Sequence, residues 1–132
     1  MIGIDTHVLV WWANGDAEKL SAAAGAALGE ALANGKIFIS SITAWEIAML
    51  VARGRLGLTE DVRHWLDIAA ELNAVEFVPI DNEIAVLSTR IGDDFHRDPA
   101  DRFIVATCQK FAVPLVTADE KIRRYPRIAT IW

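Results

Sequence analysis

The chain contains very little cysteine: Cys108 is the only one in 132 residues. A single cysteine excludes an internal disulfide, which fits a protein that works in a reducing compartment. Cys108 lies in the apolar stretch FIVATCQ. We therefore expect it to be a small core residue and not a nucleophile.

Long hydrophobic runs are also absent. No stretch reaches the roughly 18 uncharged apolar residues that a membrane span needs. The N-terminal stretch MIGIDTHVLVWW has no basic start and is interrupted by Asp5, which argues against a signal peptide. These absences predict a soluble cytoplasmic protein that has no membrane partner.

Histidine and positive charge are both scarce. The three histidines, His7, His64 and His96, are scattered and lack zinc-binding spacing such as HExxH, so we do not expect zinc. The chain has 18 acidic and 13 basic residues and a net charge of −5. This balance argues against binding of nucleic acid by bulk electrostatics, so the positions of the acids matter more.

What is present is an alternation of short apolar strands with helices. Ser21, Thr59, Asp81 and Asp98 are suitable N-caps for four of the helices, and Gly35 is suitable to end one of them. The expected strands are apolar on both faces and cover residues 1–5, 36–40, 75–80, 113–119 and 128–132. This pattern predicts one α/β domain over residues 1–132, a three-layer α/β/α sandwich with a short, mainly parallel central sheet.

Five carboxylates fall where strands end or helices begin. Asp5 and Asp119 follow two strands, and Asp98 and Asp101 open a helix. Glu46 lies in ITAWEIAMLVA, which is so apolar that we expect a helix buried on most of its surface. A buried carboxylate is costly unless it pairs, protonates or binds a metal. Because the carboxyl ends of parallel strands share one edge of the sheet, all five acids should meet there.

A cluster of only Asp and Glu is a hard oxygen site, suited to Mg²⁺ or Mn²⁺. An acidic pocket that holds such ions can activate water for phosphodiester cleavage. Helix capping alone could instead explain Asp98, Asp101 and Asp119. A non-catalytic receiver-like phosphoacceptor module would require a lysine where Ala118 and Asp119 follow LVT. A phosphatase with Asp5 as nucleophile would require a second acid where His7 stands.

Four stretches resemble, in order, the motifs of the PIN domain family, and within it the toxin ribonucleases of the VapC type. They are IDTHVLVWW, SSITAWEIAML, HRDPADRFIVATC and PLVTADEKI, and the resemblance covers nearly the whole chain. It implies a metal-dependent endoribonuclease that is the toxin of a toxin–antitoxin pair. A PIN-type nuclease that acts on other nucleic acid or in RNA processing is the alternative.

The resemblance also assigns residues. It implies Asp5, Glu46, Asp101 and Asp119 as the catalytic and metal-binding acids, with Asp98 as an additional metal ligand or a helix cap. Thr6 and Thr117 match the hydroxyls that orient carboxylates or water. Relatives of this type bind an antitoxin through an apolar groove, for which Trp11, Trp12 and helix 22–33 are candidates, and they commonly form homodimers.

An RNA backbone that enters an acidic pocket needs positive charge at the rim. Arg97, Arg123 and Arg124 lie next to the acidic motifs and are the candidates for RNA binding. Arg102 stands at the fourth position of a helix, where the helix dipole disfavours a cation. We expect it to pair with a site carboxylate or to face the scissile phosphate.

Overall fold

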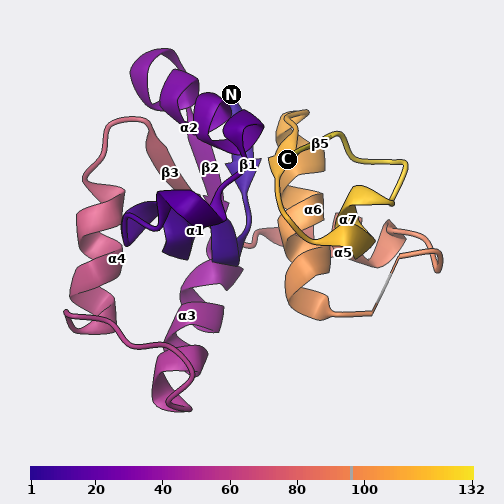
Figure 1. Cartoon of the computed structure of the whole chain (residues 1–132). Coiled ribbons are helices and arrows are strands. Elements are labelled where there is room, and N and C mark those ends of the chain that lie inside the picture. The colour runs from indigo at the N-terminus through magenta and orange to yellow at the C-terminus, as the bar shows by residue number, and fades with distance from the viewer. Residues whose placement is uncertain (96) are drawn as a thin grey trace.

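The computed structural model of the chain describes residues 1–95 and 97–132, so His96 lies outside the described residues. Five strands form one parallel sheet in the order β3-β2-β1-β4-β5 (Figure 1). The strands are β1 (Ile2–Ile4), β2 (Ile37–Ser40), β3 (Val75–Val78), β4 (Leu115–Val116) and β5 (Thr130–Ile131). The predicted α/β fold and its five strands are confirmed.

Helices cover both faces of this sheet. The helices are α1 (Thr6–Ala13), α2 (Ala22–Asn34), α3 (Ile42–Ala52), α4 (Val62–Ala70), α5 (Asn82–Arg90), α6 (Pro99–Phe111) and α7 (Glu120–Arg123), with a 3₁₀ helix, η1, at Ala17–Lys19. One core cluster joins the sheet to α1, α2 and α4, and a second joins it to α5, α6 and α7. The chain is therefore the three-layer sandwich that the sequence predicted.

The sheet has a switch point between β1 and β4. The chain builds β1, β2 and β3 outward in one direction, then returns to place β4 and β5 on the other side of β1. In open parallel sheets a ligand site forms beyond the carboxyl ends of the strands at such a point. α3 begins at this edge and extends below the sheet between α4 and α6 in Figure 1.

The predicted caps are correct at three helices and wrong at one. Ser21, Asp81 and Asp98 each accept a hydrogen bond from a backbone amide in the first turn of the helix that follows. For α4 the sequence favoured Thr59, but the helix starts later and Asp61 is its cap, accepting from the Arg63 amide at 3.1 Å. Both residues are acceptable caps, so spacing alone did not decide between them.

The prediction that α3 is buried on most of its surface is wrong. Thr43 and Ile47 are the buried residues of this helix, whereas the Trp45 side chain is 55% exposed. The helix contacts α1, α4, α6 and β2, and most of its other residues are half-buried. Trp45 is therefore the large apolar side chain of α3 that these contacts leave exposed.

β1 and α6 approach each other closely at one position. A Cβ atom added to Gly3 would lie 2.3 Å from Sγ of Cys108, so a larger residue would fit there only if the Cys108 side chain shifted. Cys108 is buried, and burial raises the pKa of its thiol to about 12. It is the core residue that the sequence predicted. No helix in the described part of the chain is long and apolar enough to span a membrane.

Candidate active site

The structure brings the five acids to one pocket at the carboxyl edge of the sheet. This pocket has a volume of about 380 Å³. It is lined by Asp5, Thr6, His7, Trp11, Glu46, Asp98, Asp101, Ala118 and Asp119. We call it the acidic pocket.

Three of the five acids also cap helices. Asp5 accepts from the Val8 amide at 2.9 Å, and Asp98 accepts from the Ala100 amide at 3.0 Å. Asp119 accepts from the Lys121 amide at 2.8 Å and from the Ile122 amide at 3.3 Å. These three acids can cap helices and also line the pocket, because the pocket lies where three helices start.

A threonine hydroxyl holds Asp5. Thr117 is fully buried after β4 and donates from Oγ1 to Oδ2 of Asp5 at 2.5 Å. Oγ1 of Thr117 also accepts a hydrogen bond from the Asp119 amide at 3.1 Å. Thr117 therefore connects the strand-end acid of β1 to the backbone that carries the acid after β4.

Two further threonines, Thr6 and Thr43, form a hydrogen-bonded chain that holds Glu46 in the apolar α3 helix. Thr6 donates from Oγ1 to Oε1 of Glu46 at 2.5 Å, and its oxygen lies 3.1 Å from Oγ1 of Thr43. Because the single Thr6 proton is used on Glu46, Thr43 is the donor to Thr6. Thr43 and Glu46 are three residues apart and share one face of α3. Sequence reasoning missed Thr43, although this spacing was the available signal.

Burial and the neighbouring carboxylates raise the pKa of Asp5, Glu46 and Asp101. Burial, followed by repulsion from Asp98, Asp119, Glu46 and Asp5, raises the pKa of Asp101 from 3.8 to about 7. Burial is also the largest cause that raises the pKa of Asp5 and of Glu46, against the threonine hydrogen bonds that lower it. The protein holds negative charge here at a cost, which a bound cation would offset.

The chemistry of the donors fits a hard divalent cation. All five acids offer carboxylate oxygens. Among the lining residues of the described chain, His7 is the one whose side-chain nitrogen could bind a metal ion. In the described residues, however, no three of the His, Cys, Asp and Glu side chains are already arranged around one point.

A second hollow adjoins the acidic pocket, and we call it the basic hollow because three of the four residues that it does not share with the pocket are basic. It is lined by Arg97, Asp98, Asp101, Asp119, Glu120, Lys121 and Arg124, so the two share Asp98, Asp101 and Asp119. Arg97 and Arg124 thus lie where the sequence placed RNA-binding charge. Arg123 is exposed and is not among the described lining residues of this hollow, whereas Lys121, which the sequence analysis did not select, is.

Arg102 makes other contacts than the sequence suggested. Its guanidinium donates to the carbonyl of Ile91 at 2.8 Å and to that of Phe95 at 3.0 Å, with longer contacts to the carbonyls of Ser88 and Gly92. These carbonyls lie at and after the C-terminus of α5, whose dipole favours a cation. Backbone carbonyls therefore stabilise the positive charge of Arg102. These hydrogen bonds connect the segment after α5 to α6.

Comparison with known proteins agrees with this geometry. The family model described as PIN domain matches residues 2–128. The chain belongs to the PIN domain family. Sequence comparison with curated proteins gave no significant match.

Solved structures share the PIN fold of this chain. A chain of VapBC2 from Rickettsia felis, solved bound to a DNA fragment from its promoter, is 20% identical with a TM-score of 0.72 and covers 98% of this chain and 97% of that one. A chain of DNA-bound VapBC from Salmonella typhimurium is 17% identical with a TM-score of 0.66, over 98% and 95%. A chain of a toxin–antitoxin complex from Klebsiella pneumoniae is 22% identical with a TM-score of 0.62, over 96% and 93%. At these identities the likeness is one of fold.

Proposed function

We propose that this chain is a Mg²⁺- or Mn²⁺-dependent endoribonuclease and the toxin of a toxin–antitoxin pair, working in the cytoplasm. The observation that carries the proposal is the acidic pocket, in which Asp5, Glu46, Asp101 and Asp119 meet at the switch point of the sheet. The raised pKa of Asp101 supports a cation-binding role, because an ion would relieve the repulsion that raises it. The fold shared with chains of toxin–antitoxin complexes supports the biological setting.

In this proposal the four acids hold the ion or ions, and Asp98 is a fifth ligand or remains a helix cap. A divalent ion at such a site activates water and stabilises charge on the phosphate. Thr117 keeps Asp5 in place, and Thr6 does the same for Glu46. Arg97, Lys121 and Arg124 attract the RNA backbone to the rim, which offsets the repulsion between phosphate and carboxylate.

The test is cleavage of single-stranded RNA by the purified chain. We expect cleavage with Mg²⁺ or Mn²⁺, loss of cleavage in excess EDTA, and no restoration by zinc. Asp101→Asn should abolish cleavage, whereas Asp67→Asn, which changes an exposed acid on α4, should retain it. A DNA strand of the same sequence distinguishes a ribonuclease from a nuclease of other specificity. Undiminished cleavage in EDTA would overturn the metal mechanism.

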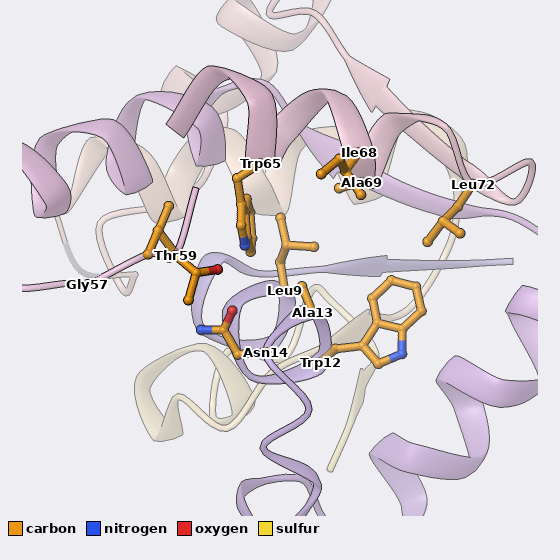
Figure 2. Close-up of a pocket in the computed structure, with 11 residues that line it drawn as sticks. Leu9, Trp12, Ala13, Asn14, Gly57, Thr59, Trp65, Ile68, Ala69 and Leu72 are labelled. Carbon is orange, nitrogen blue, oxygen red and sulfur yellow. The ribbon is translucent and has the colours of Figure 1, made fainter. Parts of the chain in front are cut away.

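An apolar groove supports the antitoxin partner. α1, α4 and the segment before α4 enclose a hollow of about 660 Å³, in which Leu9, Trp12, Trp65 and Leu72 are among the lining side chains (Figure 2). Expression of the chain should arrest growth, and co-expression of the short reading frame encoded beside it should restore growth. Trp12→Ala should weaken this rescue while leaving the arrest unchanged. If neither arrest nor rescue occurs, the toxin assignment fails.

The exposed face of α3 supports the homodimer. Trp45 and Met49 line a further hollow with Pro99, next to Glu46 of the acidic pocket. Trp45→Glu should convert a dimer into a monomer in sedimentation analysis, because it places a charge in an apolar contact. Leu32→Glu, on the exposed side of α2, is the matched control and should leave the dimer intact.

A further inference from the structure

Two adjacent tryptophans of α1 have different surroundings. Trp12 packs against the core cluster that includes Leu9 and Trp65, and it lines the apolar groove of Figure 2. Trp11 is half-buried and belongs to neither core cluster of the described residues. It lines the acidic pocket instead. Its ring thus lies on the wall of a pocket of carboxylates and packs against other rings instead of the core clusters.

Trp11 is the centre of a row of rings. The His7 ring lies 5.9 Å from it and the Trp132 ring 6.1 Å from it, with interplanar angles of 45° and 51°. His7 is exposed, and Trp132 is half-buried and packs against the core cluster that contains Leu9. The row therefore presents ring surface beside the carboxylates, and Trp132 connects it to the core.

The acidic pocket and the basic hollow extend to two sides of the same three acids. Beyond Asp98, Asp101 and Asp119, the first continues to His7 and Trp11, and the second continues to Arg97, Lys121 and Arg124. A nucleic acid strand has the same two parts, an anionic backbone and flat bases. The basic side matches the backbone, and the aromatic side matches a base.

We propose that Trp11 is a base-stacking subsite for the nucleotide next to the scissile phosphate. The inference rests on the proposed ribonuclease function and assigns a substrate-binding residue to it. Bases stack on aromatic side chains in a sequence-tolerant way, since every base has a flat face. In a duplex the bases stack on one another and are not available to a protein ring. Stacking also supplies binding energy that does not depend on charge, which an acidic pocket needs.

The experiment measures binding of a fluorescent ten-nucleotide RNA by anisotropy, with Ca²⁺ in place of Mg²⁺ so that binding is observed apart from cleavage. Trp11→Ala should raise Kd by about 5- to 100-fold, the range expected for one stacked base. Trp11→Phe should retain most of the affinity, and Val86→Ala, a control at an exposed apolar side chain of α5, should bind as the parental chain does. The duplex form of the RNA should bind at least tenfold more weakly than the single strand.

An abasic scan tests the same contact without changing the protein. Removing one base at a time should reveal one position where the parental chain loses affinity as it does in Trp11→Ala. In Trp11→Ala the same abasic RNA should show no further loss, because the two changes remove one contact. If the parental protein binds and cuts RNA but neither Trp11→Ala nor any abasic site weakens binding, the stacking proposal is wrong and the ribonuclease proposal stands. The same holds if the two losses of affinity add in the combined experiment. If the parental chain neither binds nor cuts RNA, both proposals are overturned.

Discussion

The Thr6 hydroxyl donates a hydrogen bond of 2.5 Å to Oε1 of Glu46, across the gap between α1 and α3. The two residues lie 40 positions apart in the sequence, and the bond lowers the pKa of a carboxylate that burial raises. Thr6 thus controls both the position and the ionisation of Glu46. The remaining question is how much of the activity depends on this one hydroxyl.

Thr6→Val should reduce kcat by about 10- to 100-fold, the usual effect of losing a group that orients a metal ligand. Because the lost bond lowers the Glu46 pKa, the acid limb of the pH–rate profile should move to higher pH. Thr6→Ser keeps the hydroxyl and is the matched control, with a profile close to that of the parental chain. Equal losses in the two variants would show that the methyl group, and not the hydrogen bond, is what matters.

The metal-free protein should become less stable as pH rises from about 4 to about 7. In this range the folded chain keeps a proton on Asp101, whose pKa is about 7, while the unfolded chain has released it near 3.8. The folded state therefore binds more protons, so the free energy of unfolding falls with pH. The raised pKa values of Asp5 and Glu46 act in the same direction.

Urea denaturation in EDTA at several pH values measures this slope. Asp101→Asn should flatten it and should be more stable than the parental chain at pH 8, whereas Asp67→Asn should keep the parental slope. Added Mg²⁺ should stabilise the parental chain at pH 8 more than Asp101→Asn, because it binds the ionised cluster. A stability that rises through this window in EDTA would contradict the repulsion described here.

Arg102→Ala should lower the free energy of unfolding by about 2–3 kcal/mol, because it leaves the carbonyls of Ile91 and Phe95 without their charged donor. Arg102→Lys should lower the free energy of unfolding by less, since the lysine ammonium can form some of the hydrogen bonds of the guanidinium. Arg63→Ala, at a side chain that is 83% exposed, is the control and should change stability by less than about 0.5 kcal/mol.

Turnover of the folded Arg102→Ala protein tests the earlier expectation that this arginine faces the phosphate. If Arg102→Ala is less stable but turns over at the parental rate, Arg102 has a structural role. A variant of normal stability and reduced kcat would favour a place beside the chemistry instead.

Ala112→Gly should stabilise the chain by about 0.5–1 kcal/mol. Ala112 ends α6 with φ 52° and ψ 45°, the left-handed conformation that glycine adopts without steric cost. Ala26→Gly, in the exposed middle of α2, is the opposite control and should cost about 1 kcal/mol. Thermal melts of the two variants should shift in opposite directions, and a loss at both positions would refute the argument.

The sequence predicted the strands, the sandwich and the five acids because each depends on local pattern and on the geometry of parallel sheets. It did not predict which face of α3 is exposed, since Trp45 and Ile47 are equally apolar and only packing distinguishes them. It assigned Trp11 to the apolar groove together with Trp12, whereas Trp11 lines the acidic pocket, because two adjacent tryptophans look alike until the helix is placed. The partner of Arg102 required the course of the segment after α5, which no local pattern fixes.

Gly3 and Cys108 lie outside the acidic pocket, yet they decide how far apart its two halves are. Asp5 follows Gly3 by two residues, and Asp101 precedes Cys108 by seven, which is about two turns of α6. The missing side chain at position 3 leaves room for the thiol, which lets α6 lie close to β1 and brings their acids nearer to each other. A larger residue at position 3 would be tolerated only with a smaller one at position 108. The spacing of the carboxylates therefore depends on a position that has no side chain.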